Sequence, residues 1–174
     1  FIGRLDSLFI AESKIEGPLV SSDISGLIGQ YAHGNEPSHH IVHLYNYVNQ
    51  SWKTQQLIDT ILHTQYFNNP NGLSGNEDCG QMSAWYVLNA MGFYQVCPGS
   101  PIYSVGRPIF DKVTINLPNG KVFEIIANNN SRTNKYIQSI RLDNILLESP
   151  FFMHSDIMKG GKIVMEMGNT PVKQ

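Results

Sequence analysis

The chain has 174 residues, of which 41% are hydrophobic and 15% are charged, and its formal net charge is −2. This composition can bury a core and excludes a disordered chain. There is no lysine or arginine cluster, which argues against nucleic acid or an anionic membrane as a partner, and no apolar run reaches the roughly 18 residues of a membrane span. The chain starts at Phe1 within a helical pattern, so we expect a longer polypeptide around it.

The first half of the chain, residues 1–92, is expected to be mainly helical, because apolar residues recur there every three to four positions. We predict a first helix that ends at Gly17-Pro18 and further helices over residues 38–48, 52–66 and 78–91. Pro37 suits the first turn of the second helix, Ser51 is the predicted N-cap of the third, and Gly92 is the predicted stop of the fourth.

The second half, residues 93–174, is expected to consist of strands. Two apolar segments flank Pro118-Asn119-Gly120, which is typical of a hairpin turn. The predicted strands cover residues 113–117, 122–126, 136–142 and 162–167. A run of helices followed by a run of strands indicates an α+β fold with an antiparallel sheet.

Two turns of similar composition each hold an acidic side chain directly before a helical segment. They are Gly34-Asn35-Glu36-Pro37-Ser38-His39-His40 and Gly75-Asn76-Glu77-Asp78-Cys79-Gly80. A structural role explains Glu36 and Asp78, because a carboxylate is favoured at a helix N-terminus. Acid/base chemistry also explains them if both turns border one pocket. An acid at position 36 needs a raised pKa, which burial against Tyr31 or Trp85 would have to supply against the helix dipole.

Histidine and cysteine side chains near these turns suggest other chemistry. His39 and His43 have the i, i+4 spacing of two zinc ligands, but the glutamate of an HExxH motif is missing, so hydrogen bonding is favoured for both. Cys79 lies at a predicted helix start, where a lowered pKa can make it a nucleophile beside a histidine. Cys79 and Cys97 are the only cysteines, and a disulfide between them remains open.

The second turn also carries oxygen-bearing side chains in succession, at Asn76, Glu77 and Asp78. Hard cations such as Ca²⁺ prefer oxygen ligands, although this spacing is not that of an EF-hand loop. Aromatic residues surround both turns: Tyr31, Tyr45, Trp52, Trp85 and Tyr86. An aromatic ring beside amide, imidazole and carboxylate groups suits a sugar, whose apolar face stacks while its hydroxyls form hydrogen bonds.

The residues of both turns resemble glycoside hydrolase family 92. The similarity lies in residues 33–40 and 75–86 and extends to residues 44–47, 52–55, 98–100 and 154–161. Members of this family are calcium-dependent inverting exo-α-mannosidases, in which an N-terminal β-sandwich precedes an (α/α)6 barrel. The resemblance implies that residues 1–92 are the last helices of the catalytic barrel, and that residues 93–174 form a loop and the C-terminal antiparallel strands.

The resemblance also implies roles for individual residues. Glu36 matches the general acid and Asp78 the general base. Substrate-binding roles are expected for Asn35, His39, His40, Trp85 and Asn76, and the nearest candidate ligands for Ca²⁺ are Glu77 and Asn76. In an inverting enzyme the acid protonates the leaving oxygen while the base activates water on the opposite face of the sugar ring.

The expected partners are a mannose-containing glycan and the remainder of the same polypeptide, and the expected location is periplasmic, cell-surface or secreted. Two alternatives remain open. One is a glycan-binding or scaffolding module without catalysis, and the other is a hydrolase that uses Cys79 with a histidine.

Overall fold

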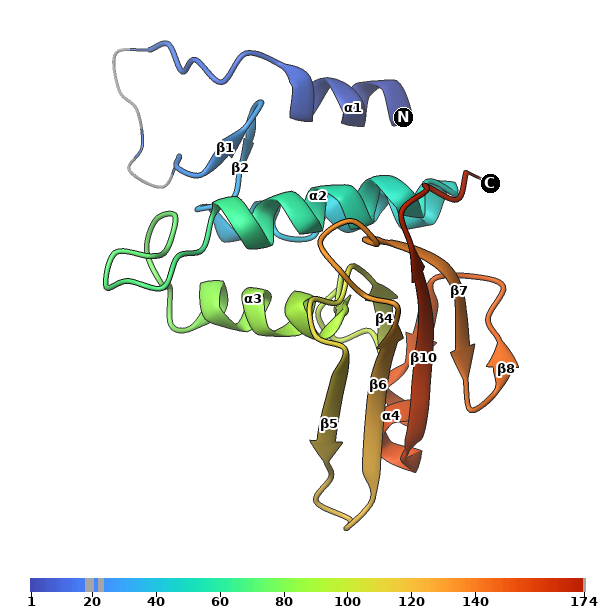
Figure 1. Ribbon diagram of the computed structural model, residues 1–174. Helices are drawn as coiled ribbons and strands as arrows, with labels where there is room; N and C mark the ends of the chain where they lie inside the picture. Colours follow the sequence, from blue (N-terminus) through green and yellow to red (C-terminus); the bar gives the residue numbers. More distant parts are fainter. Residues whose placement is uncertain (18–20, 22–23, 174) are drawn as a thin grey trace.

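The computed structural model describes residues 1–17, 21 and 24–173, and it has the expected α+β fold (Figure 1). The helices are α1 (Ile2–Ile10), η1 (Glu36–Ser38), η2 (Ile41–Val48), α2 (Ser51–Thr64), α3 (Gln81–Met91) and α4 (His154–Lys159). The strands are β1 (Leu27–Ile28), β2 (Tyr31–Ala32), β3 (Phe93–Tyr94), β4 (Ile102–Val105), β5 (Lys112–Asn116), β6 (Val122–Asn128), β7 (Tyr136–Leu142), β8 (Ile145–Leu146), β9 (Phe151–Met153) and β10 (Gly161–Gly168). No helix among the described residues is long and apolar enough to cross a membrane.

The helical half differs from the prediction at its boundaries. Helix α1 ends at Ile10, well before Gly17, and Pro18 lies outside the described residues. Residues 38–48 form 3-10 turns rather than an α-helix. Thr54 Oγ1 donates to the Val42 carbonyl, 2.8 Å away, and so engages an oxygen that an α-helix would use for its own ladder.

The ends of the two longer helices show which capping predictions hold. Helix α2 has Gln50 as its N-cap, so the prediction that Ser51 is the cap was wrong. Helix α3 begins at Gln81 behind Gly80, three residues later than predicted for Asp78. Gly92 ends α3 with φ 103°, which confirms the predicted stop, because glycine reaches this left-handed conformation without strain.

The main sheet has five strands in the order β5-β6-β10-β7-β8. The predicted hairpin of β5 and β6 is confirmed, and β10 lies between β6 and β7. Because β10 returns to the sheet after β9 and α4, it runs parallel to β6, so the expectation of a purely antiparallel sheet was wrong. Two small sheets, β1-β2 and β3-β4-β9, were not predicted, and the first lies in the half expected to be helical.

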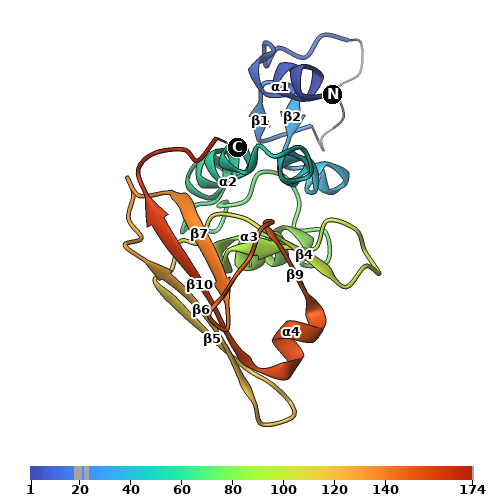
Figure 2. The ribbon, with the colours of Figure 1, turned by 90° about the vertical axis from the view of Figure 1, so that its right-hand side faces the viewer.

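The core consists of two clusters of buried side chains. One joins the sheets to α4 and includes Phe123, Ile125, Phe152, Ile157, Ile163 and Met165. Figure 2 shows α4 across from the strands of the main sheet. The other lies among α2, α3 and the turns before them and includes Tyr31, Val42, Ile58, Ile61, Leu62 and Trp85. This second cluster positions the candidate site.

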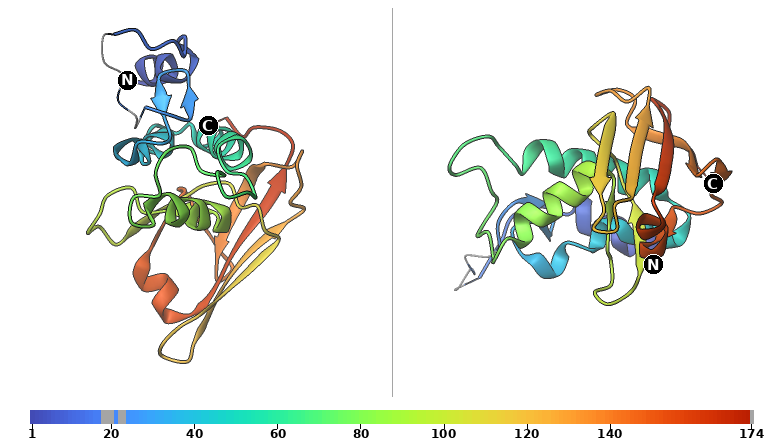
Figure 3. Two further views of the ribbon diagram at one scale, coloured as in Figure 1. Left: turned by 90° about the vertical axis from the view of Figure 1, so that its left-hand side faces the viewer. Right: turned by 90° about the horizontal axis from the view of Figure 1, so that it is seen from below.

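Polar contacts connect the helices to the sheet, and Figure 3 shows α2 and α3 beside the strands. Gln55 Oε1 on α2 accepts a hydrogen bond of 3.0 Å from the Ile137 amide on β7. Asp59, also on α2, lies 3.1 Å from Arg107 Nε and 3.3 Å from Lys135 Nζ. Helices α2 and α3 pack against each other, but the described residues form no closed ring of helices.

Candidate active site

The two acidic turns lie side by side because glycines let their backbones touch. A Cβ at Gly34 would overlap the Ser74 carbonyl oxygen and Ser25 Oγ. A Cβ at Gly75 would lie 3.0 Å from the Gly34 carbonyl oxygen, and Gly75 has φ +96°. Only glycine permits both the close approach and this backbone conformation. The glycines that open the two sequence motifs therefore bring Glu36 and Asp78 to the same place.

The Asp78 side chain lies within hydrogen-bonding reach of Glu36 and contributes to lowering the pKa of Glu36. Two carboxyl groups this close influence each other's protonation. Asp78 is held in a left-handed turn, because Asp78, Cys79 and Gly80 have φ of 51°, 57° and 89°. Non-glycine residues in this region are strained by roughly 1–2 kcal/mol each, and such strain is concentrated at functional sites. The structure thus brings together the two predicted catalytic residues, across 42 positions of sequence.

The pKa of Glu36 is lowered from its ordinary value. The largest cause is a hydrogen bond from its own backbone, and the second is the hydrogen bond with Asp78. Glu36 is partly exposed, so burial raises its pKa less than the first two causes lower it, and the expected net increase is not found. In this arrangement Glu36 favours the ionised form.

Glu36 borders an open cavity of about 600 Å³. Three more of the predicted substrate-binding residues, Asn35, His39 and His40, line the same cavity. The remaining lining residues are Pro37, Gln81, Tyr94, Gln95, Val96 and Pro98. This combination of a carboxylate, amides, imidazoles and a tyrosine offers several hydrogen-bonding groups beside an aromatic ring, as a sugar site requires.

Trp85 and Asn76 do not line this cavity. Trp85 is 0% exposed, and its indole N–H donates to the His39 carbonyl over 3.1 Å. The prediction that Trp85 contacts substrate was wrong, because its ring is enclosed behind the site and supports the histidine turn from within. Asn76 lies exposed in the second turn.

His39 is a neutral, hydrogen-bonded side chain and not a metal ligand. Its Nε2 lies 3.0 Å from the His33 carbonyl oxygen and its Nδ1 lies 3.1 Å from Gln81 Nε2. Burial lowers the pKa of His39, and nearby His33 has its pKa lowered by burial to about 3. Both ring nitrogens of His43 are bonded too, to Ser104 Oγ at 3.1 Å and Asn89 Oδ1 at 2.9 Å. The zinc hypothesis for His39 and His43 is therefore excluded.

A chain of buried polar groups continues behind His39. His33 lies 2.9 Å from Tyr31 Oη and 2.7 Å from Tyr66 Oη, and Tyr66 donates to the Met82 carbonyl over 3.1 Å. These contacts tie the first turn to the start of α3. His33 was not singled out from the sequence as a residue that holds the first turn in place, although it directly precedes Gly34.

Three cavity residues, Gln81, Tyr94 and Gln95, were not singled out from the sequence. Gln81 is the first residue of α3, three positions after Asp78, and it donates to His39 and to Tyr94 Oη, 3.2 Å away. Gln95 donates to the Ser100 carbonyl over 2.6 Å, which orders the loop at the far side of the cavity. A glutamine within the second motif was the one signal available for Gln81.

The residues expected to hold Ca²⁺ do not complete a cation site. Glu77 accepts hydrogen bonds from the Ser83 amide, 2.9 Å from Oε1, and from Ser83 Oγ, 2.7 Å from Oε2. Among the described residues, no group of three or more His, Cys, Asp or Glu side chains converges as metal ligands do. Ca²⁺ takes about 6–8 oxygen ligands, which Asn76 and Glu77 do not supply. The two hydrogen bonds from Ser83 connect Glu77 and its strained turn to α3.

Cys79 and Cys97 are both free and exposed. Within the part of the chain that the structure describes, no hydrogen bond joins Cys79 to a histidine. Nucleophilic activation needs such a contact, so the cysteine-histidine alternative has no support in the geometry.

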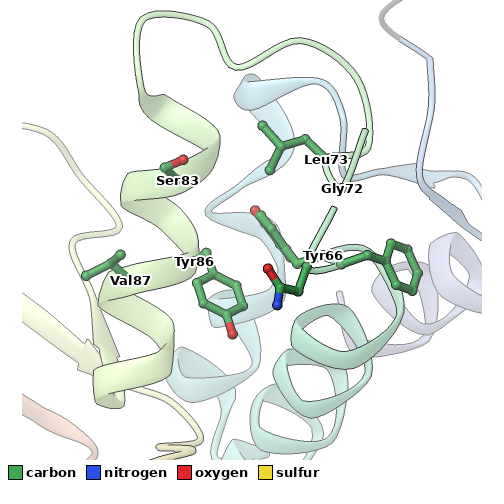
Figure 4. A pocket seen from close by; sticks show the side chains of 8 residues that line it. Tyr66, Gly72, Leu73, Ser83, Tyr86 and Val87 are labelled. Atoms are coloured by element: carbon green, nitrogen blue, oxygen red, sulfur yellow. The ribbon is translucent and has the colours of Figure 1, made fainter. Parts of the chain in front are cut away.

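A second cavity of about 430 Å³ lies between α3 and the segment before the second turn (Figure 4). It is lined by Tyr66, Phe67, Asn68, Gly72, Leu73, Ser83, Tyr86 and Val87. No carboxylate or imidazole borders it, so it lacks the groups needed for acid/base chemistry. The cavity beside Glu36 is the stronger candidate for an active site.

Comparison with known proteins places this geometry in context. The chain matches the glycosyl hydrolase family 92 catalytic domain over residues 1–169. A solved family GH92 α-mannosidase from Bacteroides thetaiotaomicron, in complex with mannoimidazole, is 42% identical, with a TM-score of 0.92 over 98% of this chain and 22% of its own. An inverting GH92 mannosidase from the VPI-5482 strain of that species is 38% identical, with a TM-score of 0.81 over 98% of this chain and 24% of its own.

A curated relative is an uncharacterized secreted glycosidase from Arthroderma benhamiae. It is 27% identical over 138 residues, which are 78% of this chain and 18% of the relative. The chain thus spans about a fifth of the length of the proteins it matches.

Proposed function

The chain belongs to glycosyl hydrolase family 92, and we propose that it forms part of the active site of an α-mannosidase that removes terminal α-linked mannose from glycans with inversion. The solved relatives are α-mannosidases, one of them inverting, and they support this substrate and stereochemistry. The helices of residues 1–92 then contribute to a larger (α/α)6 barrel, which the remainder of the polypeptide completes.

The proposal rests on the proximity of Asp78 to Glu36, which lines the 600 Å³ cavity. Hydrolysis of a glycoside needs one carboxyl group to protonate the leaving oxygen and a second to activate water. In our proposal Glu36 is the proton donor and Asp78 is the general base. Asn35 and His40 line the same cavity and bind the sugar hydroxyls there, while His39, whose two ring nitrogens are bonded to protein groups, supports the site.

The spacing of the pair sets a condition on this mechanism. In inverting enzymes the two carboxyl groups stand roughly 6.5–9.5 Å apart, which leaves room for a water molecule. Glu36 and Asp78 lie within hydrogen-bonding reach of each other, so we expect the pair to separate when substrate and water enter between the two groups. The lowered pKa of Glu36 results partly from this contact, and separation removes that part of the effect.

Calcium dependence is part of the proposal through the family resemblance. Among the residues that the structure describes, no group of three or more His, Cys, Asp or Glu side chains forms a metal site, so we expect further Ca²⁺ ligands from elsewhere in the polypeptide. No step of the mechanism is assigned to the ion. The secreted relative supports an extracytoplasmic or extracellular location for a glycan-cleaving enzyme.

The anomeric form of the released sugar tests the proposed function. We expect proton NMR of the full-length polypeptide with an aryl α-mannoside to show β-mannose first, followed by slow mutarotation. The Asp78→Asn variant, with an unchanged fold, should lose at least about 100-fold in kcat. Initial release of α-mannose, or a kcat for Asp78→Asn near that of the wild type, would contradict the inverting pair.

A further inference from the structure

We propose that Gln81 is a substrate-binding residue, whose Oε1 accepts a hydrogen bond from a hydroxyl group of the sugar in the cavity, and that His39 fixes its orientation. This inference rests on the proposed function of the cavity beside Glu36. It adds a contact to a residue that neither the sequence motifs nor the comparisons assign.

The position of the ring proton on His39 determines the orientation of Gln81. Its Nε2 lies 3.0 Å from the His33 carbonyl oxygen, and a carbonyl oxygen can only accept. Nε2 therefore carries the hydrogen. Since His39 is 1% exposed and burial disfavours the charged ring, Nδ1 is an unprotonated acceptor. The tautomer of His39 follows from its surroundings.

The side-chain amide of Gln81 can take only one of its two orientations. An acceptor at His39 Nδ1 requires a donor opposite it, and Gln81 Nε2 is 3.1 Å away. The same nitrogen lies 3.2 Å from Tyr94 Oη, so both amide hydrogens are directed at protein groups. The amide cannot be reversed without placing its oxygen against the lone pair of His39. Oε1 is therefore the part of the amide that remains for a ligand, and it can only accept.

Gln81 lies close to the proposed carboxyl pair. Gln81 lines the same cavity as Glu36, so a ligand beside the carboxyl pair lies within reach of its side chain. The backbone N–H of Gln81 also donates to the backbone carbonyl of Asp78, 3.2 Å away, at the start of α3. Gln81 and the proposed base thus belong to one hydrogen-bonded turn. A hydroxyl group held by Oε1 fixes the sugar relative to Asp78, which is how positioning groups promote reaction.

The chemistry of the cavity favours a sugar hydroxyl as the donor. The side-chain amide of Gln81 is neutral, and both of its hydrogens are bonded to protein groups, so it does not attract an anion. The carboxylate of Glu36 in the same cavity repels an anion. A polyol supplies donors for Glu36 and Gln81 together, with the Tyr94 ring nearby for an apolar face. The competing explanation is structural: Gln81 only ties α3 to the histidine turn.

The test combines altered protein with altered substrate in the full-length enzyme. The kcat and KM are measured for an aryl α-mannoside and its 2-, 3-, 4- and 6-deoxy analogues, with wild type, Gln81→Leu and Gln81→Met. The matched control is Gln56→Leu, an exposed glutamine on α2 outside the cavity. With the wild type, we expect kcat/KM for one deoxy analogue to be about 10-fold to 100-fold lower than for the parent substrate. With the parent substrate, we expect kcat/KM of the Gln81 variants to be lower than that of the wild type by a similar factor.

The decisive measurement combines each Gln81 variant with each deoxy analogue. With Gln81→Leu or Gln81→Met, the sensitive analogue and the parent should react at nearly equal rates, because the contact is already absent. If every analogue loses the same factor in both variants, Gln81 is only structural and the inference is overturned. If the wild type hydrolyses no α-mannoside, the proposed function fails, and the same cycle is measured on Kd with methyl α-mannoside and its deoxy analogues. Equal losses for all ligands there would also overturn the inference.

Discussion

Glu36 and Asp78, which are 42 positions apart in the sequence, lie within hydrogen-bonding reach of each other, and Asp78 contributes to lowering the pKa of Glu36. The two turns approach because Gly34 and Gly75 have no side chain, and Asp78 adopts a left-handed conformation in the second turn. The protonation of one carboxyl group in such a close pair depends on the other. The pair is the basis of the proposed chemistry.

Substrates with different leaving groups test the acid role of Glu36. A good leaving group such as dinitrophenolate needs no protonation, whereas a sugar alcohol does. For Glu36→Gln we expect a loss of about 100-fold to 10,000-fold with a disaccharide and a loss below about 10-fold with a dinitrophenyl α-mannoside. Equal losses with both substrates would show that Glu36 is not the donor and serves instead to position Asp78.

Gly34→Ala should damage the site through backbone crowding. The new Cβ meets the Ser74 carbonyl, which cannot move without shifting the second turn. We expect kcat/KM to fall by at least about 10-fold and thermal stability to decrease, because overpacking typically costs roughly 1–3 kcal/mol. Gly3→Ala is the matched control, since a Cβ there meets no atom within 4 Å and alanine favours helix. A Gly34→Ala enzyme as active as Gly3→Ala would contradict the steric role.

Substitutions at Cys79 test the strained turn. Its φ of 57° is tolerated best by glycine and worst by a β-branched residue. Cys79→Gly is expected to leave the unfolding free energy unchanged or raise it by up to about 1 kcal/mol, while Cys79→Val lowers it. Thermal unfolding of both variants measures the difference. Equal destabilisation by the two substitutions would mean that the turn is not under backbone strain.

The buried histidines predict a loss of stability in acid. Burial lowers the pKa of His43 to about 4 and that of His33 to about 3, below the unfolded value of 6.5. The unfolded chain therefore binds more protons between these values, so stability is fully present above pH 6.5 and falls as the pH drops toward 4 and then 3.

This effect is measured by the unfolding midpoint as a function of pH. His43→Gln is expected to flatten the profile between pH 6.5 and 4. The control is His154→Gln, at an exposed position on α4, which should keep the wild-type profile. An unaltered slope in His43→Gln would exclude His43 as a source of the acid sensitivity.

Chelation and the Glu77 side chain test the calcium proposal. EDTA should abolish mannosidase activity in the full-length enzyme, and added Ca²⁺ should restore it. Because both oxygens of Glu77 accept hydrogen bonds from Ser83, Glu77→Gln and Ser83→Ala are expected to lower the unfolding midpoint. The Ca²⁺ concentration at half-maximal activity should stay within about threefold, a free-energy change below about 0.7 kcal/mol. A larger increase with Glu77→Gln alone would make Glu77 a ligand.

Local patterns were sufficient where a residue's role depends on its near neighbours. The hairpin of β5 and β6 follows from alternating apolar residues around a turn, and the end of α3 follows from Gly92. The second 3-10 helix was predicted as an α-helix, and this was wrong. The Val42 carbonyl accepts a hydrogen bond from Thr54, which belongs to a later segment and is not visible in the local pattern. The place of β10 beside β6 was not predictable, since alternation does not encode which strand is the neighbour.

For the candidate site, the sequence by itself determined the family and the two turns that carry the carboxylates, because both are written in contiguous residues. Only the tertiary structure decided how those residues meet. In the folded chain, Asp78 lies close to Glu36 and Trp85 is enclosed behind the site. The Nδ1 atom of His39 accepts a hydrogen bond from Gln81, which lines the cavity. These outcomes depend on burial and on hydrogen-bond partners distant in sequence, which spacing along one chain does not specify.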